Sequence, residues 1–148
     1  MNVFMSRLAA AYSSWDKSSG HTPEQFFNLL AENVEVHTIL SECLPQDPTA
    51  GPFLGKRHAF HWFASVALRW EVLSVETIKL TSSGNCVIWE GRSKYRNRQT
   101  LRILETPRLQ IWTVENGRAV KVQDYLDSLS YAKATGALDE KKPGSPET

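Results

Sequence analysis

Asp124 is the residue whose type and position point most directly to chemistry, and it lies near the end of the segment NGRAVKVQDYLD. Asn116 and Gly117 favour positive φ at both centres of a type I′ turn, so the chain is expected to reverse there. Side chains alternate along a strand, which places Asp124 on the same face as Val120 and Val122. A carboxylate among aliphatic side chains has a raised pKa unless a donor stabilises the anion. We therefore predict a general base or acid on an apolar strand face.

Two other side chains are candidates to act with this acid. Tyr12 shares a helical face with apolar residues and could point its hydroxyl into a pocket, although such a face more often packs as core. His61 has an ordinary pKa near neutrality and could shuttle a proton or pair with Asp124, whereas a surface position would give it no role. A structural role for Asp124 also stays open, in which it only accepts a hydrogen bond from Tyr12, His61 or Arg102.

The sequence contains no recognisable pattern for a metal, a nucleotide or a covalent intermediate. His58 and His61 lie three residues apart on one predicted helix, but no further ligands follow at a metal-binding spacing. A glycine-rich phosphate loop, a Ser-His-Asp spacing and a nucleophilic cysteine context are all absent, so we expect no metal and no cofactor. Cys43 and Cys86 form no CxxC pair and are expected to be reduced, packed thiols.

Length and charge narrow the class of protein. The 148 residues, of which 41% are hydrophobic, fit one globular domain. A formal net charge of +1 gives no long-range field that would favour nucleic acid or an anionic membrane. No apolar run reaches the roughly 20 residues of a membrane-spanning helix. We therefore expect a soluble cytoplasmic protein whose recognition depends on the shape of a pocket.

Helices and one strand are predicted in the first half of the chain. Apolar residues at helical spacing predict a helix over residues 3–17. Thr22 is expected to cap a second helix over 23–32, and alternation then predicts a half-buried strand over 34–40. A loop rich in proline and glycine precedes a third helix over 56–68. The buried stripe predicted for this third helix consists of Phe60, Phe63, Ala64, Ala67 and Leu68.

The second half changes to a period of two, which predicts an antiparallel meander. Its strands are expected at 70–81, 86–96, 99–114 and 119–126. The side chains predicted to face inward on the first two strands are Val72, Ile78, Leu80, Val87, Trp89 and Tyr95. A short helix is expected after Asp127, so that a single domain covers 1–136 and a disordered tail covers 137–148.

The strand over 99–114 receives two conflicting register predictions. A two-residue turn at Asn97 turns Arg102 and Leu104 inward, whereas the last hairpin turns Leu109 and Ile111 inward. A bulge near Pro107 or a longer loop around Asn97 would each shift the register. Both explanations stay open at this point.

Three segments resemble the SnoaL-like polyketide cyclases, ketosteroid isomerases and limonene epoxide hydrolases of the nuclear-transport-factor-two-like superfamily. They are AAAYSSWDKSSGHTPEQFFNLLAENVEVH, PFLGKRHAFHWF and NGRAVKVQDYLD, within a resemblance that covers about residues 5–130. It implies a cone-shaped α+β fold with three N-terminal helices packed in a strongly curved, mostly antiparallel sheet. It also implies a pocket for a small, largely apolar organic molecule and a homodimer formed through the outer sheet face.

The ketosteroid isomerase and cyclase patterns resemble this chain at single positions. Tyr12 falls where the isomerases keep an oxyanion-binding tyrosine, but their general base would fall at about Thr38 and their second acid near Leu109. Asp124 falls where the cyclases place an acid that abstracts a proton next to a carbonyl. Steroid-type isomerisation therefore lacks two of its three groups, and the cyclase pattern departs least from this chain.

The epoxide hydrolase pattern also resembles the chain at Asp124. The arginine and second aspartate of those enzymes would fall near Gly91 and Ser93, so their familiar triad is not expected. Two hypotheses follow from the resemblance and the residues. One is an acid-base isomerase, cyclase or (de)hydratase in which Asp124 moves a proton and Tyr12 or His61 steadies the oxyanion. The other is a non-catalytic ligand-binding or dimeric assembly module of the same fold.

Both hypotheses place a set of apolar side chains around the interior. The residues predicted to line the pocket are Trp15, Phe53, Trp62, Trp89, Leu109, Ile111, Val122 and Leu126. The first hypothesis predicts a cavity that reaches Asp124. The second predicts that Trp15, Trp62, Trp89 and Trp112 fill the interior instead.

Overall fold

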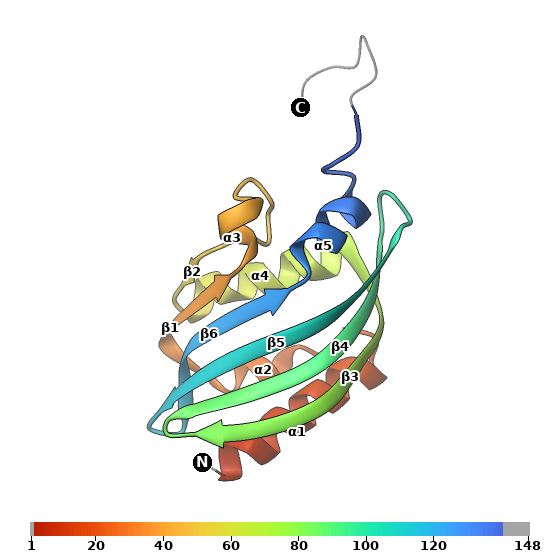
Figure 1. Ribbon diagram of the computed structural model, residues 1–148. Helices are drawn as coiled ribbons and strands as arrows, with labels where there is room; N and C mark the ends of the chain where they lie inside the picture. Colours follow the sequence, from red (N-terminus) through yellow and green to blue (C-terminus); the bar gives the residue numbers. More distant parts are fainter. Residues whose placement is uncertain (1, 141–148) are drawn as a thin grey trace.

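One curved sheet organises the molecule, and the computed structural model describes residues 2–140 of the chain. Within these residues the strands are β1 (Leu30–Thr38), β2 (Phe53–Leu54), β3 (Trp70–Ser83), β4 (Cys86–Asn97), β5 (Ile103–Glu115) and β6 (Arg118–Leu126). They follow the order β2-β1-β6-β5-β4-β3 across the sheet (Figure 1). β1 and β6 are parallel, and the other neighbouring pairs are antiparallel. The predicted α+β class with a mostly antiparallel sheet is confirmed.

Helices pack on one face of this sheet and enclose the core with it (Figure 1). In the described part of the chain they are α1 (Asn2–Lys17), α2 (Glu24–Phe27), α3 (Leu40–Cys43), α4 (Lys56–Arg69) and α5 (Ser128–Thr135). α1 contacts β3, and α4 contacts β1 and β3. The short elements α3 and β2 lie in the segment predicted as loop. None of the helices from 2 to 140 combines the length and the apolar composition that a membrane crossing needs.

α1 forms as its spacing predicts. Phe4, Leu8, Tyr12 and Trp15 recur on one face and are all buried, with exposed fractions of 6% or less. The helix ends where Gly20 adopts a left-handed φ of 81° and its amide donates to the Trp15 carbonyl. This face of α1 brings the Tyr12 hydroxyl into the interior.

The second helix is much shorter than predicted, because β1 begins at Leu30. Leu30 pairs with Ala119 of β6, and the Ala119 amide donates to the Leu29 carbonyl at 2.7 Å. Sheet pairing therefore prevails over the helical pattern in this segment. The expected Thr22 cap is also wrong, since the Thr22 hydroxyl donates to the Ser14 carbonyl of α1 instead.

α4 has the predicted bounds within one residue, but it buries a different face. Ala59 and Trp62 are buried, while Phe60 and Leu68 of the predicted stripe are 55% and 78% exposed. The helix is thus rotated by about one residue, which is roughly 100°. As a result His61 lies at the surface and not in the interior.

The β5–β6 hairpin has the predicted turn and a different register. Asn116 and Gly117 both have positive φ, at 52° and 75°, as a type I′ turn requires. The ladder then shifts after Val114, and Val120 is the extra residue of a β-bulge. This bulge sets Gln110 opposite Asp124 and Trp112 opposite Val122.

The shifted register corrects the predicted inner face of β5. Leu109 and Ile111 lie on the outer face, whereas Leu104, Gln110 and Trp112 lie inside. The predicted bulge near Pro107 does not occur, because the β4–β5 ladder is continuous from Cys86 to Arg96. The connection before β5 is longer than two residues, since Arg96 pairs with Ile103.

β3 contains two further irregularities that correct the prediction for Ile78. Register shifts occur between Val72 and Ser74 and between Thr77 and Lys79. Ile78 falls at the second shift and is 60% exposed, although Val72 and Val75 remain buried.

A polar cluster joins the C-terminal helix to the loop after α3, and we call it the α5 anchor. It comprises Asp47, Thr49, Arg69 and Tyr131. Arg69 donates to Asp47 at 2.8 Å, and the Tyr131 hydroxyl donates to the other Asp47 oxygen at 2.9 Å. Thr49 also donates to Asp47 at 2.6 Å. Through Tyr131 the cluster therefore fixes α5 to α4 and to the loop.

Asp127 caps α5 by accepting from the Ser130 amide. Arg102 does not point inward and instead pairs with Asp139 beyond the helix, at 2.8 and 2.9 Å. Of the predicted tail, 141–148 lies outside the described residues. Residues 137–140 are described, and Asp139 is the one that carries this ion pair.

Candidate functional site

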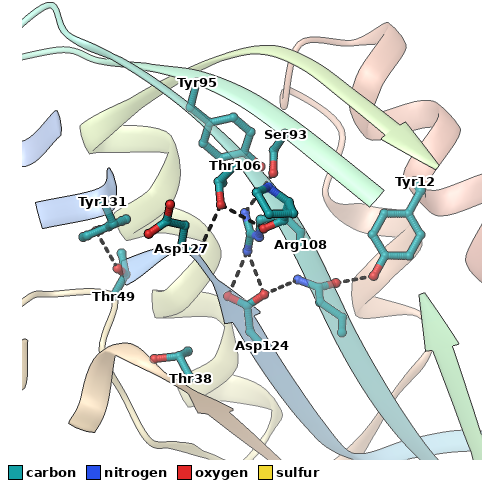
Figure 2. Close-up of polar contacts among 12 residues, drawn as sticks. Tyr12, Thr38, Thr49, Ser93, Tyr95, Thr106, Arg108, Asp124, Asp127 and Tyr131 are labelled. Carbon is teal, nitrogen blue, oxygen red and sulfur yellow. Dashed lines mark hydrogen bonds and ion pairs between the residues drawn. The ribbon is translucent and has the colours of Figure 1, made fainter. Parts of the chain in front are cut away.

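Asp124 is paired with an arginine that was not expected beside it. Its two carboxylate oxygens lie 2.7 and 2.8 Å from Nη2 of Arg108, and one of them also accepts from Nε2 of Gln110 at 2.8 Å (Figure 2). The Asp124 side chain is only 4% exposed and the Arg108 side chain 11%. The acid is therefore a buried, charge-compensated carboxylate that accepts three hydrogen bonds.

Gln110 connects this ion pair to Tyr12. Its amide nitrogen donates to Asp124, and its amide oxygen accepts from the Tyr12 hydroxyl. The Tyr12 oxygen in turn accepts from Nε1 of Trp112 at 3.1 Å. Nη1 of Arg108 extends the connection to Ser93 at 3.4 Å. We call these residues, Tyr12, Gln110, Asp124, Arg108 and Ser93, the polar array.

The strand registers explain why these side chains meet. Arg108, Gln110 and Trp112 alternate on the inner face of β5, and the bulge at Val120 brings Asp124 of β6 opposite Gln110. Without the extra residue the same hairpin would place Asp124 opposite Leu109. One β-bulge therefore assembles the ion pair.

The position of Tyr12 depends on a glycine in β4. Trp89 lies flat over Gly91, where a Cβ atom would overlap the indole and the Glu76 carbonyl. Nε1 of Trp89 donates to Thr77 at 2.8 Å, which fixes the ring in this orientation. The Tyr12 ring stacks on Trp89 with centroids 4.1 Å apart and an interplanar angle of 4°. Gly91 thus makes room for the aromatic layer that holds the tyrosine.

Two neighbouring cavities adjoin the polar array. The larger has a cavity volume of about 60 Å³ and is partly open to solvent. Its lining residues are Tyr12, Trp15, Phe26, Trp62, Phe63, Val66, Val75, Trp89, Ser93, Tyr95, Arg108, Gln110 and Trp112. Eight of these thirteen residues are aromatic. The larger cavity is therefore an apolar, aromatic space with polar groups along one wall.

The smaller cavity has a volume of about 30 Å³, and Asp124 is one of its lining residues. Trp62, Val66, Tyr95 and Arg108 line both spaces, so these side chains form the partition between them. Asp124 itself lines only the smaller of the two. From the larger cavity it is reached through Arg108 and Gln110.

Three hydrogen-bond donors on the wall of the larger cavity find no acceptor among residues 2–140. Nε of Arg108 is buried and has no partner. The Tyr95 hydroxyl accepts from Nε1 of Trp15 at 3.2 Å but donates to no described atom, and the Ser93 hydroxyl only accepts from Arg108. Buried donors in folded proteins are almost always satisfied. The Ser93 and Tyr95 hydroxyls are therefore available to an acceptor inside the cavity, whereas Nε of Arg108 has almost no accessible surface.

Burial and charge together set the protonation of the array. Burial raises the pKa of the Tyr12 phenol well above its ordinary value, and the hydrogen bond from Trp112 offsets only part of this effect. Burial alone would lower the pKa of Arg108, but the adjacent Asp124 carboxylate outweighs it, so the pKa is raised. At neutral pH Tyr12 is a neutral hydroxyl and Arg108 is a cation.

The predicted wall residues divide into three groups. Trp15, Trp62 and Trp89 line the larger cavity, and Leu126 lines the smaller one. Phe53 and Val122 are buried in the core but line neither. Leu109 and Ile111 lie on the opposite face of the sheet, because the bulge at Val120 changes the register.

The structure does not bring His61 to this site. It is exposed on α4, with its ring 6.0 Å from that of His58. No group of three or more histidine, cysteine, aspartate or glutamate side chains that could hold a metal occurs in the described part of the chain. Cys43 is exposed and Cys86 half-buried, so Cys43 is not packed as predicted.

Arg108 and Gln110 are the site residues that the sequence reasoning missed. The unbulged register had placed Leu109 and Ile111 inward, which turned both polar residues outward. The alternation of Arg108, Gln110 and Trp112 was the available signal, since a large aromatic side chain at the third position favours an inner face.

Thr38, at the position of the isomerase base, pairs with Asp124 in the parallel ladder and donates to the Ala50 carbonyl at 2.6 Å.

This arrangement can hold and polarise a molecule more readily than it can remove a proton from one. Hydroxyl, amide and guanidinium donors converge near one wall of an apolar space, which suits an oxygen atom that carries partial negative charge. Proton abstraction by Asp124 would compete with the hydrogen bonds that already occupy its oxygens.

Solved structures with the same fold are NTF2-like proteins. One of unknown function from Burkholderia pseudomallei is 17% identical, with a TM-score of 0.78 over 90% of this chain and 98% of that one. A protein with a ketosteroid isomerase-like fold from Catenulispora acidiphila, in complex with trimethylamine, is 16% identical, with a TM-score of 0.68 over 88% and 92%. A candidate SnoaL-like polyketide cyclase from Jannaschia sp. is 13% identical, with a TM-score of 0.65 over 88% and 92%.

No family model and no curated protein matches the chain. The matches cover nearly the whole of each solved structure, so this chain has the NTF2-like cone fold. The fold that the sequence resemblance implies is confirmed. At these identities the likeness concerns the fold alone.

Proposed function

We propose that this protein binds a small, largely apolar organic molecule in the larger cavity, with the polar array orienting it. The observation that carries the proposal is the aromatic cavity itself, in which polar groups gather on one wall. Ligand sites in proteins commonly combine apolar walls with a few placed polar groups. The trimethylamine held by the Catenulispora acidiphila protein supports the use of this fold for small molecules.

Filling the cavity tests this proposal. Val75 of β3 lines the larger cavity, whereas Ile78 of the same strand is exposed. The probes are acetophenone and α-methylstyrene, two small aromatic molecules of nearly the same shape, titrated while tryptophan fluorescence and NMR spectra are recorded. We expect saturable binding to the natural protein and to Ile78→Phe, and loss of binding in Val75→Phe. Circular dichroism checks that each variant is folded.

Absence of saturable binding of both probes, or equal binding to Val75→Phe, would overturn the proposal. The matched variant Ile78→Phe adds the same side chain outside the cavity. It therefore separates filling of the cavity from a general effect of the added phenyl group.

A second candidate function is acid-base catalysis as an isomerase, cyclase or (de)hydratase. It is favoured by one observation, that an acid, a neutral phenol and a guanidinium belong to one hydrogen-bonded array beside the cavity. In this function Asp124 leaves Arg108 to take a proton, and Tyr12 or Arg108 stabilises the resulting oxyanion. The reaction class is proton transfer next to a carbonyl.

Exchange of the methyl protons of acetophenone for deuterium tests this second function without knowledge of the substrate. The exchange is followed by NMR in D₂O buffer. We expect it to be faster with the natural protein than without protein, and we expect Asp124→Asn to lose this increase. An exchange rate equal to that with Val75→Phe would exclude catalysis of this step while leaving the binding proposal intact. The Asp124→Asn result counts only if circular dichroism shows a folded variant, because this change leaves Arg108 without its counter-charge.

The alternative of a dimeric assembly module is supported by the outer sheet face. Ile88, Ile111 and Leu109 lie on adjacent positions of β4 and β5, and Tyr125 of β6 is paired with Leu109. Charges of both signs surround this patch on β4, where Glu90 and Arg92 are exposed in the described structure and alternate with inward residues. Two copies related by a twofold axis could cover the apolar residues and pair these charges.

We therefore propose a homodimer through this face, with a second copy of the chain as the partner. Ile111→Lys places a charge at the centre of the patch, and Ile78→Lys, at an exposed site of β3, is its control. Analytical ultracentrifugation should give a dimer for the natural protein and Ile78→Lys, and a monomer for Ile111→Lys. A monomeric natural protein at micromolar concentration would contradict the proposal.

A further inference from the structure

We infer that the bound molecule is uncharged and presents a carbonyl oxygen to the hydroxyls of Ser93 and Tyr95, beside Arg108, an inference that rests on the proposed binding function. The starting point is the set of donors described above. The Arg108 Nε–H and the hydroxyl hydrogens of Ser93 and Tyr95 have no acceptor among the described residues, and all three residues line the larger cavity.

The two hydroxyls belong to one strand, and the Arg108 guanidinium of the neighbouring strand adjoins them. Ser93 and Tyr95 are consecutive inward residues of β4, and Arg108 of β5 reaches the Ser93 hydroxyl. Figure 2 shows Ser93, Tyr95 and Arg108 grouped on the same side of the array. An acceptor with two lone pairs on one oxygen atom fits this grouping better than a further donor would.

The charge of the site argues for an uncharged ligand. Arg108 and Asp124 are the only charged residues among those that line the two cavities, and they compensate each other. Tyr12 stays neutral because burial raises its pKa. An anionic ligand would therefore leave a net negative charge in a buried space, which is costly. A carbonyl oxygen satisfies the same donors without that cost.

The remaining wall defines the body of the molecule. Trp15, Trp62, Trp89 and Trp112 surround the space together with phenylalanine side chains. Flat rings in such surroundings pack face to face or edge to face with the wall. The ligand class is therefore a compact, flat and apolar carbonyl compound, such as an aryl ketone, ester, lactone or quinone.

Three probes of similar shape separate this inference from its alternatives. Acetophenone carries the neutral carbonyl, α-methylstyrene replaces the oxygen by a methylene group, and benzoate replaces the methyl group by an anionic oxygen. Their dissociation constants are measured by NMR titration at pH 7. We expect acetophenone to bind about tenfold more tightly than α-methylstyrene, since one to two hydrogen bonds are gained. Benzoate should bind more weakly than acetophenone.

Two variants assign the preference to the proposed donors. Ser93→Ala and Tyr95→Phe should each weaken the binding of acetophenone roughly three- to tenfold and leave the binding of α-methylstyrene nearly unchanged. Ser74→Ala, at an exposed position of β3, is the matched control and should change neither. Two donor variants are used because Tyr95→Phe also removes the acceptor of Trp15.

The possible failures are distinguishable. If neither acetophenone nor α-methylstyrene binds, the proposed binding function fails. If both bind equally, the cavity binds apolar molecules but the carbonyl inference is wrong. If benzoate binds most tightly, the site takes an anion and the charge argument is overturned. If acetophenone is preferred but both donor variants retain that preference, the oxygen is held elsewhere and the assignment of these donors is wrong.

Discussion

Two arginine–aspartate pairs lie inside the part of the molecule from residue 2 to 140, and they differ in whether all of their hydrogen-bond donors have acceptors. Arg108 and Asp124 join neighbouring strands, and their side chains are 11% and 4% exposed. Arg69 and Asp47 join α4 to the loop after α3, with side chains 28% and 8% exposed. This second pair belongs to the α5 anchor, in which the Tyr131 hydroxyl also donates to the Asp47 carboxylate.

The difference separates a pair that holds the fold from a pair that also faces a cavity. In the α5 anchor the Asp47 oxygens accept hydrogen bonds from Arg69, Thr49 and Tyr131. Arg69 is more exposed than Arg108, so water can reach it. In the polar array the carboxylate is equally well satisfied, yet Nε of Arg108 has no partner in the described structure. Unused buried donors therefore distinguish the polar array, where we propose that a ligand binds, from the α5 anchor.

Removing Asp124 should have the largest effect, because it leaves a buried guanidinium without its counter-charge. We expect Asp124→Ala to lower the free energy of unfolding by about 3–5 kcal/mol. Asp47→Ala should cost less, about 1–3 kcal/mol, since Arg69 can be hydrated. Urea unfolding followed by circular dichroism measures both.

The double variant Asp124→Ala/Arg108→Met provides the control for this comparison. It removes the uncompensated charge and should recover part of the stability lost in Asp124→Ala. Equal losses of unfolding free energy in Asp124→Ala and Asp47→Ala would show that the two ion pairs contribute alike to stability, which would contradict this prediction.

Gly91→Ala should disturb the polar array and leave the α5 anchor intact. The added methyl group overlaps the Trp89 indole and the Glu76 carbonyl, so the ring that supports Tyr12 must move. Overpacking of this kind costs about 1–3 kcal/mol. Hydrogen exchange should become faster in β4 and at the α1 amides near Tyr12 while α5 keeps its protection.

An equivalent substitution at a tolerant glycine gives the reference for this variant. Gly84 lies in the β3–β4 turn, and a Cβ atom there meets no other atom within 4 Å, although its positive φ of 59° adds local strain. Gly84→Ala should therefore affect the turn without moving Trp89. If both variants changed the near-ultraviolet spectrum of the tryptophans alike, the role assigned to Gly91 would be wrong.

Acid should weaken the α5 anchor through Asp47. Burial by itself raises the pKa of this carboxyl, but the hydrogen bonds from Thr49 and Arg69 outweigh it and the pKa is lowered. A lowered folded-state pKa gives stability that is present above the unfolded value of about 4 and is lost as the pH falls through the folded value. The free-energy difference between the natural protein and Asp47→Asn should therefore shrink below about pH 4. A difference that stays constant from pH 6 to pH 3 would contradict this linkage.

The fold could be predicted from the sequence wherever the pattern was long and regular. The spacing of Phe4, Leu8 and Trp15 predicted α1, and the period of two predicted the four long strands. The helix predicted after Pro23 failed because Leu30 pairs with Ala119, nearly ninety residues away. Local propensity cannot reveal a partner at that distance.

The site could be predicted only in part, and a single extra residue accounts for most of the error. The alternation identified Asp124 as an inward acid, but strict alternation through Val120 placed Leu109 beside it in place of Gln110. A bulge leaves no clear signal in composition, since Val120 is an ordinary strand residue. The orientation of His61 stayed open for a related reason, because a helix with apolar residues on several sides does not specify which side is buried.

The bulge at Val120 also bears on how the hairpin reaches its final pairing. A regular ladder from the same turn would bury Leu109 and Ile111 on the same face as Asp124. This pairing buries more apolar side chains, but it leaves the acid without Arg108. An isolated buried charge is costly, which disfavours the regular pairing. We therefore expect the ion pair to act as a selector of strand alignment, so that the chemistry of the pocket wall and the uniqueness of the fold depend on the same two residues.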